Sequence, residues 1–242
     1  MGGDKINAMK ASIVIPAYNE EDSISDAIQA ALAQDYPNFE VIVVDNASID
    51  RTAEIASRFP VKLVSEKRKG LLWAREAGRN AATGDVIANI DADCLPSKTW
   101  VTNGIKHFSD DSIAAVTGPY DYYDGGRLFR SASNFGQKAL YPGVNKIMQN
   151  RSVKKGAVLI GGNNLIRASA LDKAGGYDTS VIFYGEDTTT AKTISRFGKI
   201  VFDRSLQMKT SARRFKSEGL IQLTLKYWYH FFRVIFSTRP QR

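Results

Sequence analysis

The chain of 242 residues contains a single cysteine, Cys94, and lacks any long apolar run that is free of charge. One thiol cannot form an intramolecular disulfide, which excludes a disulfide scaffold and suits a reducing compartment. Crossing a bilayer takes about 20 consecutive apolar residues, and no uncharged run approaches that length. The N-terminal sequence MGGDKINAMK also lacks the apolar core of a secretory signal. We therefore expect a folded, cytoplasmic protein.

Two nucleotide-binding motifs are absent as well. No Gly-x-Gly-x-x-Gly follows a predicted strand, which argues against a dinucleotide-dependent oxidoreductase. No glycine-rich, basic phosphate loop follows the first predicted strand. This second absence argues against a sugar-1-phosphate nucleotidyltransferase and leaves that activity as a secondary alternative.

Net positive charge is small over most of the chain and concentrated at its end. Residues 201–242 hold nine basic and two acidic side chains, so they carry seven of the eight net positive charges. A nucleic-acid-binding protein would spread basic residues over a whole face, interleaved with exposed aromatic side chains. We therefore expect no nucleic acid and a local anionic partner for the terminal segment.

Short apolar runs alternate with helix-like segments in the first half of the chain. The predicted strands are residues 12–15, 41–44, 61–64 and 86–90, and the predicted helices are residues 20–32, 50–59 and 71–82. Asn19 is positioned to cap the first helix. Continuous Val/Ile runs separated by helices are typical of a mostly parallel sheet covered on both faces. The sequence predicts one α/β domain, residues 10–205, followed by a helical extension, residues 206–242.

Carboxylates stand at the ends of two predicted strands, where such sheets bind ligands. Asp45 follows the second strand, and Asp91-Ala92-Asp93 follows the fourth. In extended backbone, residues two apart point to the same face, so Asp91 and Asp93 can face one ligand. Oxygen ligands of this kind suit Mg²⁺ or Mn²⁺. The alternative interpretation of each carboxylate is an ordinary turn residue.

An ordered series of motifs is more specific than any one of them. The series consists of SIVIPAYNE from Ser12, VVDNASID from Val43, Gly84-Asp85, Asp91-Ala92-Asp93, Gly161-Gly162-Asn163-Asn164 and Glu186-Asp187. It resembles the family 2 glycosyltransferases, which have the Rossmann-like GT-A fold. The resemblance covers about residues 12–200 and implies transfer of one sugar from a nucleotide-sugar to an acceptor hydroxyl.

On the donor side, the resemblance implies a nucleotide pocket. Ala17, Tyr18 and Glu20 match the loop that lines this pocket. Asp45 matches the aspartate that accepts a hydrogen bond from the base, typically uracil, so a UDP-sugar is the expected donor. Arg75 matches an arginine near the donor phosphates.

On the metal and acceptor side, the resemblance implies which residues bind the metal and which residue accepts the proton of the acceptor hydroxyl. Asp91 matches the first carboxylate of the D-x-D motif, near ribose and metal, and Asp93 matches the principal ligand of Mn²⁺ or Mg²⁺. Asp187 matches the general base. The acceptor and donor sugar are expected at Gly162 and Asn163 and beside Glu186.

Elementary chemistry agrees with these roles. A divalent cation and Arg75 stabilise the charge that builds on the leaving phosphate. A carboxylate on the opposite side takes the acceptor proton, so the displacement inverts the anomeric configuration. The alternative interpretation of Glu186-Asp187 is a solvated helix N-terminus before residues 188–194.

Three features depart from the family pattern or extend it. Glu76 follows Arg75, where the family often has asparagine. The Gln-x-x-Arg-Trp signature of processive synthases is absent, which favours a single addition over polymerisation. Arg213-Arg214-Phe215 lies where that signature would fall, and it fits either an anion-binding segment or a solvated basic turn.

Residues 219–236 have the periodicity of an amphipathic helix. One stripe carries Gln222, Lys226, His230, Arg233 and Ser237, and aromatic and aliphatic residues fill the remaining surface. This pattern fits a helix in a membrane interface, with residues 213–242 on an anionic cytoplasmic surface. It equally fits a helix that docks on the core or on a second subunit.

Acceptor specificity is the least defined feature. Residues 120–126, rich in tyrosine and aspartate, are predicted to form a loop, and residues 128–152 remain without an assignment. A glycan or a lipid-linked saccharide is the expected acceptor, in the synthesis of cell-surface polysaccharide. The non-enzymatic alternative is a membrane-associated protein that binds a nucleotide or a sugar without catalysis.

Overall fold

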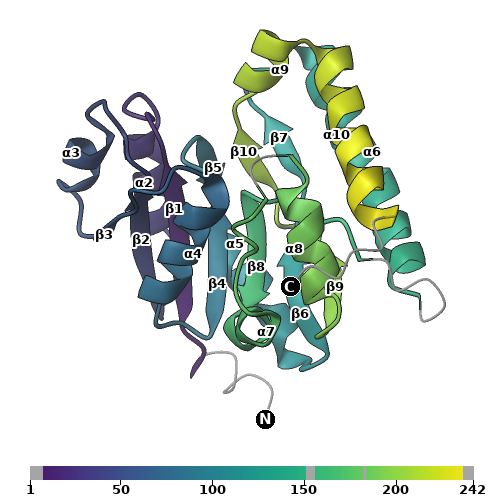
Figure 1. The fold of residues 1–242 in the computed structure, drawn as a ribbon, viewed down its shortest axis with the longest axis horizontal. Helices are drawn as coiled ribbons and strands as arrows, with labels where there is room; N and C mark the ends of the chain where they lie inside the picture. Colours follow the sequence, from purple (N-terminus) through teal and green to yellow (C-terminus); the bar gives the residue numbers. More distant parts are fainter. Residues whose placement is uncertain (1–7, 151–155, 182–183, 237–242) are drawn as a thin grey trace.

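The computed structural model describes residues 8–150, 156–181 and 184–236 (Figure 1). A seven-stranded sheet forms its centre, in the order β3-β2-β1-β4-β8-β6-β9. Its strands are β1 (Ala11–Ala17), β2 (Phe39–Asp45), β3 (Lys62–Ser65), β4 (Val86–Ile90), β6 (Ile113–Thr117), β8 (Asn163–Arg167) and β9 (Lys199–Phe202). All neighbouring pairs are parallel except those of β8 with β4 and β6.

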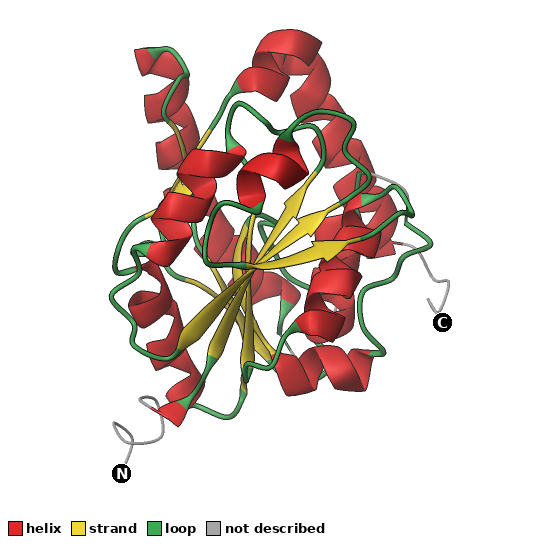
Figure 2. Ribbon diagram, turned by 90° about the vertical axis from the view of Figure 1, so that its left-hand side faces the viewer, coloured by secondary structure: helices red, strands yellow, loops and turns green. Residues whose placement is uncertain are grey.

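Helices cover both faces of this sheet, as Figure 2 shows. They include α2 (Ile24–Leu32), α3 (Thr52–Ala56), α4 (Leu71–Ala81), α5 (Trp100–Ile105), α7 (Ala168–Ala174) and α8 (Glu186–Ile194), with a 3₁₀ turn η1 (Lys106–Ser109). Every residue of β1 and β4 is buried, which explains their continuous apolar sequences. The predicted α/β architecture with a mostly parallel sheet is confirmed.

The sheet register brings the predicted strand-end residues to one edge. Ala17, the last residue of β1, is paired with Asp45, the last residue of β2. Strand β4 lies on the other side of β1, parallel to it, and Asp91 follows its last residue, Ile90. The carboxyl ends of β1, β2 and β4 therefore meet, and this edge is the wall on which the candidate site is built.

A second sheet stands beside this edge. Its order is β5-β10-β7, from β5 (Cys94–Pro96), β7 (Tyr120–Tyr122) and β10 (Met208–Thr210). The prediction of a loop at residues 120–126 is wrong for its first three residues, because they pair with β10. Strand β10 itself belongs to the predicted extension, so the first part of that extension is hydrogen-bonded to β5 and β7.

Two local predictions are corrected by the structure. Asn19 does not cap a helix: α2 begins at Ile24 after Ser23, and Asn19 has a φ of 52°. Its side-chain oxygen instead accepts a hydrogen bond from the backbone N–H of Ile49, at 2.9 Å. The helix predicted at residues 50–59 is shorter, and α3 covers Thr52–Ala56 only.

Helices from the unassigned stretch and from the extension complete the fold. They are α6 (Arg127–Met148), α9 (Arg213–Glu218) and α10 (Leu220–Phe236). Glycine at position 219, with a φ of 85°, joins α9 to α10. Over the part of the chain described, no helix combines the length and the apolar character that spanning a bilayer requires.

Two residues of the polar stripe predicted on α10 contact other elements of the protein. The ammonium group of Lys226 lies 2.7 Å from a carboxylate oxygen of Glu218, and the ring of His230 stacks on Tyr184 with centroids 5.3 Å apart. Arg233 is exposed, and Ser237 lies outside the described residues. Leu223, Val234 and Ile235 are buried, so α10 docks through part of its apolar surface while the rest of that surface stays exposed.

Candidate active site

The guanidinium of Arg75 joins the strand ends to the N-terminus of α8. Arg75 lies on α4 and its side chain is only 3% exposed. Its Nη2 is 3.2 Å from Asp91 Oδ1, and its Nη1 is 3.1 Å from Asp187 Oδ1. Two carboxylates 96 positions apart in sequence are thus held by one cation, which compensates their mutual repulsion.

Asp187 is fixed through both carboxylate oxygens. Arg75 holds one oxygen, and the other accepts a hydrogen bond of 3.0 Å from the backbone N–H of Gly161. A side chain at position 161 would overlap Asp187 and Arg75, so this close approach requires glycine. Burial raises the pKa of Asp187 above its ordinary value, against the opposing charge of Arg75. A carboxylate with a raised pKa in a fixed position is suited to accept a proton.

Asp91, Asp93 and Cys94 form a cluster whose ligand atoms all lie within 4.8 Å of one another. Burial raises the pKa of the Cys94 thiol well above its usual value, so the thiol stays protonated and is a poor ligand. Burial and the charge of Asp91 raise the pKa of Asp93 to about 6. The remaining oxygen donors, Asp91 and Asp93, fit Mn²⁺ or Mg²⁺ better than a thiophilic ion.

Arg213 closes this cluster from the side of α9. Its Nε lies 3.3 Å from Asp93 Oδ2. Its two Nη atoms both donate to the carboxylate of Glu20, Nη1 at 2.8 Å. The alternative of a solvated basic turn at residues 213–215 is therefore wrong, since Arg213 bridges two carboxylates and Phe215 packs against Tyr122 with ring centroids 5.3 Å apart.

The predicted nucleotide loop lies along the ends of β1 and β2. Ala17 is buried, and its carbonyl accepts a hydrogen bond of 2.8 Å from the backbone N–H of Asn46. Tyr18 is exposed, with the Lys69 ammonium 4.8 Å from its ring centroid. Asp45 is buried and accepts a hydrogen bond of 3.3 Å from the backbone N–H of Ser48. These residues share one edge of the sheet, as predicted from the strand ends.

The Gly161–Asn164 segment contributes its backbone to the site. A Cβ at position 162 would overlap Asp91 Oδ2 and the hydroxyl of Tyr120, so Gly162 allows the segment to lie against the strand ends. Asn163 behaves differently from the expectation. Its side chain is fully buried and bonds to Trp100 Nε1 at 2.8 Å and to the Leu206 carbonyl at 2.8 Å. Its side chain holds the second sheet in place and does not face the site.

Glu186 stands at the start of α8 beside the predicted base. Its Oε2 is buried and has no hydrogen-bond partner in the described part of the chain. Burial, with the adjacent charge of Asp187, raises the pKa of Glu186 to about 7. Glu186 is therefore a polar group available to a ligand at the N-terminus of the helix.

Glu76, the departure from the family pattern, points away from the site. Its carboxylate accepts a hydrogen bond of 3.0 Å from the backbone N–H of Tyr177 and pairs with Arg79 at 2.6 Å. The hydroxyl of Tyr177 in turn accepts a hydrogen bond of 2.9 Å from Asn89. Glu76 thus anchors the chain that precedes α8 rather than contacting a donor.

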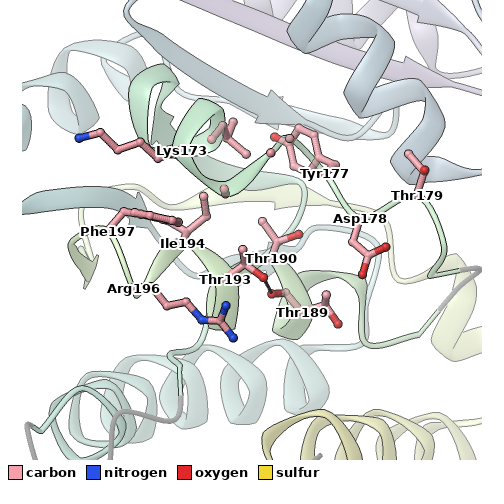
Figure 3. A pocket seen from close by; sticks show the side chains of 14 residues that line it. Lys173, Tyr177, Asp178, Thr179, Thr189, Thr190, Thr193, Ile194, Arg196 and Phe197 are labelled. Carbon is pink, nitrogen blue, oxygen red and sulfur yellow. Dashed lines mark hydrogen bonds between the residues drawn. The ribbon is translucent and has the colours of Figure 1, made fainter. Parts of the chain in front are cut away.

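A separate cavity of about 310 Å³ lies between residues 171–179 and α8. Figure 3 shows the threonine side chains of α8 near Tyr177 and Asp178. None of the residues predicted for the site lines this cavity. It is distinct from the candidate site, which is an open edge at the strand ends.

The sequence does not predict two contacts of the site. The hydroxyl of Tyr120, which is part-buried, lies 3.3 Å from Asp91 Oδ2. For Arg213 the sequence leaves an anion-binding segment and a solvated turn as alternatives and does not predict its pairing with Asp93 and Glu20. Neither contact has a local sequence signal, because Tyr120 and Arg213 reach the site through the β7–β10 pairing.

A known sequence family matches the part of the chain that holds most of the site residues. The sequence model of the family described as Glycosyl transferase family 2 matches residues 12–175, which is more than half of the chain. The chain belongs to glycosyl transferase family 2. The predicted family is therefore confirmed, and the matched range contains the strand ends, Arg75, the D-x-D motif and Gly162 but stops short of Asp187.

Two curated relatives extend the comparison. The chain is 29% identical over 185 residues to the glycosyltransferase AglE of Haloferax volcanii. The aligned region covers 72% of this chain and 58% of that protein. It is 30% identical over 159 residues to the dolichol-phosphate mannosyltransferase of Pyrococcus furiosus, covering 63% of this chain and 40% of that protein. The chain thus spans about half the length of these relatives.

Solved structures share the fold. The mannosyltransferase PcManGT from Pyrobaculum calidifontis, in complex with GDP-Man and Mn²⁺, has a TM-score of 0.66 and 22% identity, covering 95% of this chain and 65% of its own. The glucosyl-3-phosphoglycerate synthase from Mycobacterium tuberculosis, with Mn²⁺, UDP and phosphoglyceric acid, has a TM-score of 0.64 and 20% identity, covering 99% and 84%. The predicted GT-A fold is confirmed by this likeness.

Proposed function

We propose that the protein is an inverting, metal-dependent glycosyltransferase that transfers a single sugar from a nucleotide-sugar to an acceptor hydroxyl. The observation that carries this proposal is the bridge from Asp91 through Arg75 to Asp187. It brings the carboxylate assigned to the donor side and the carboxylate assigned to the acceptor side onto the two neighbouring Nη atoms of one buried guanidinium. An in-line displacement needs the metal that stabilises the leaving group and the base to act on one anomeric carbon, and this proximity supports such a site.

On the donor side, Asp91 and Asp93 would hold Mn²⁺ or Mg²⁺, and the oxygen donor set fits either ion. Such an ion supplies positive charge for the departing diphosphate. Asp45 accepts a hydrogen bond from the base, and Ala17, Tyr18 and Glu20 line the pocket. UDP is the proposed nucleotide, because Asp45 matches the family aspartate that typically contacts uracil, and a carboxylate there can accept a hydrogen bond from the ring N–H of that base.

On the acceptor side, Asp187 takes the proton of the acceptor hydroxyl as the new bond to the anomeric carbon forms. Arg75 acts on Asp187 directly and keeps its carboxylate in one orientation. Glu186 and the backbone around Gly162 contact the sugars. The side chain of Asn163 is buried, so we propose that it holds this segment in place and does not contact the sugars.

The acceptor is proposed to be a glycan or a lipid-linked saccharide, with the protein peripheral on an anionic cytoplasmic membrane surface. The exposed side of α10 supports this location. It presents large apolar and aromatic residues, namely Ile221, Leu225, Trp228, Tyr229, Phe232 and Phe236. Aromatic-rich helix faces beside basic residues are typical of membrane interfaces.

Replacing the proposed base tests the activity. Nucleotide release would be followed with UDP-glucose, UDP-GlcNAc and GDP-mannose in the presence of Mn²⁺ and candidate saccharide acceptors. Asp187→Asn should lower acceptor-dependent turnover about a thousandfold and leave nucleotide affinity unchanged. Asp172→Asn, which removes an exposed carboxylate remote from the site, is the control. Unchanged turnover in Asp187→Asn would refute the assignment of the base.

A further inference from the structure

Arg213 occupies a place that the proposed function leaves unexplained. It is the first residue of α9, more than 100 positions from the carboxylates it pairs with. Its Nε faces Asp93, at 3.3 Å, and its Nη atoms face Glu20. Asp93 is the proposed principal metal ligand and Glu20 belongs to the proposed nucleotide loop, so one cation touches both halves of the donor site.

A cation at this position has a direct consequence for metal binding. A divalent ion held by Asp93 must share the carboxylate with the guanidinium or displace it, and two positive charges at such short range repel each other. The side chain of Asp93 is 16% exposed, so solvent screens this repulsion only in part. Arg213 therefore lowers the affinity of the site for a free divalent cation.

We propose that Arg213 is an internal counter-cation that competes with the divalent metal for Asp93. It compensates the charge of the D-x-D carboxylate, and metal binding weakens or displaces its contact with Asp93. This inference rests on the proposed metal-dependent function and adds a residue outside the segment matched by the family.

The structure provides a way for Arg213 to release Asp93 without unfolding α9. Helix α9 is anchored elsewhere: Phe215 packs on Tyr122 and Phe129, and Lys216 pairs with Asp124 at 2.9 Å. The Arg213 side chain is 57% exposed and makes two hydrogen bonds to Glu20. Its contact with Asp93 can therefore break while Glu20 retains the guanidinium, so a side-chain movement is sufficient.

Metal binding in the absence of a sugar donor measures this competition. The intact chain would be titrated with Mn²⁺ alone, and free Mn²⁺ would be followed by electron paramagnetic resonance. Arg213→Gln should lower the Kd for Mn²⁺ about tenfold relative to the wild type. Lys216→Gln is the matched control, because it removes one positive charge from the same helix at the same side-chain exposure of 57%. Its Kd should stay within about twofold of the wild type.

The outcomes separate this inference from the proposed function. The competition would be overturned if Arg213→Gln bound Mn²⁺ with the same Kd as the wild type or with a higher Kd. Either result would leave the proposed metal site intact. An equal gain in Lys216→Gln would also overturn it, since the effect would then be one of net charge. Absence of Mn²⁺ binding in every variant, with and without UDP, would overturn both proposals. Circular dichroism of Arg213→Gln would establish that the variant is folded.

Discussion

The two walls of the candidate site are built in different ways. The strand wall consists of Ala17, Asp45, Asp91 and Asp93 at the ends of parallel strands whose backbones are hydrogen-bonded to one another. The helix wall consists of the N-termini of α8 and α9. It is held by side chains, namely the ion pairs of Arg75 and Arg213 and the aromatic contacts of Phe215.

This difference has a functional meaning. Backbone ladders fix the strand wall whether or not a ligand is present, which suits recognition of a nucleotide and a metal. Ion pairs in the helix wall are exchangeable, because an incoming charge can replace either partner. The strand wall is therefore the preorganised part of the site and the helix wall is the part that responds.

The largest expected effect comes from breaking the contact between the two walls. Arg75→Met removes the buried guanidinium and leaves Asp91 and Asp187 without their shared cation. We expect a loss of about 2–4 kcal/mol in the free energy of unfolding, measured with urea, together with loss of turnover. Arg79→Met, on the same helix but more exposed, should cost less than about 1 kcal/mol. Equal losses in the two variants would contradict the special position of Arg75.

A smaller effect should follow from adding a side chain where the Gly161–Asn164 segment lies against the strand wall. Gly162→Ala places a methyl group against Asp91 and Tyr120, and we expect destabilisation of about 1–3 kcal/mol and weaker binding of UDP. Gly136→Ala is the control, because nothing lies within 4 Å of a Cβ there and the position is inside α6. It should stabilise the protein by up to about 1 kcal/mol. A neutral Gly162→Ala would mean that this segment is not in close contact with Asp91 and Tyr120.

The helix wall should also have a signature in the pH dependence of stability. The pKa of Glu186 is raised to about 7 from 4.5, so the folded protein binds this proton more tightly than the unfolded chain. The contribution of Glu186 to stability is therefore present below pH 4.5 and is lost as the pH rises towards 7.

Glu186→Gln removes this loss. The variant should be more stable than the wild type by about 1–2 kcal/mol at pH 8, and the gain should shrink at pH 5, as measured by urea unfolding. Glu54→Gln, an exposed carboxylate on α3, should show no such trend. A gain that is the same at both pH values would exclude titration of Glu186 as its cause.

The smallest effect on stability is expected on the exposed surface of α10. Trp228→Ser and Phe232→Ser alter exposed side chains and should change the free energy of unfolding by less than about 0.5 kcal/mol. The same changes should reduce co-sedimentation with vesicles that contain anionic lipid. Leu63→Ser, on β3, is the control for loss of an exposed apolar side chain. Vesicle binding that is unaffected by the α10 changes would remove this helix from the membrane proposal.

The same contrast explains what the sequence could predict. Strands β1, β2 and β4, and the positions of Asp45 and Asp91 at their ends, follow from local apolar runs and turn residues. Strand β8, which inserts antiparallel between β4 and β6, pairs with β4 over more than 70 positions and with β6 over about 50, and it has no local signal. The β5-β10-β7 sheet and the contact of Arg213 with Asp93 depend on the same kind of long-range pairing.

Asn163 and α10 show a second limit. The motif predicts that Asn163 belongs to the site segment, but only the tertiary structure directs its side chain to Trp100. The periodicity of residues 219–236 predicts the helix almost to the residue. It does not predict which face docks, because Lys226 and His230 find their partners on other elements, Glu218 and Tyr184.

Calorimetry of UDP binding, with and without Mn²⁺, tests the central claim most directly. The claim is that the strand wall forms a metal-assisted nucleotide site through Asp93. We predict that the wild type binds UDP more tightly with Mn²⁺ and that Asp93→Ala loses this dependence on the metal. UDP binding that is independent of Mn²⁺, or metal-dependent binding that persists in Asp93→Ala, would contradict the account. GDP and dTDP, titrated in parallel, would separate a different base preference from a wrong site.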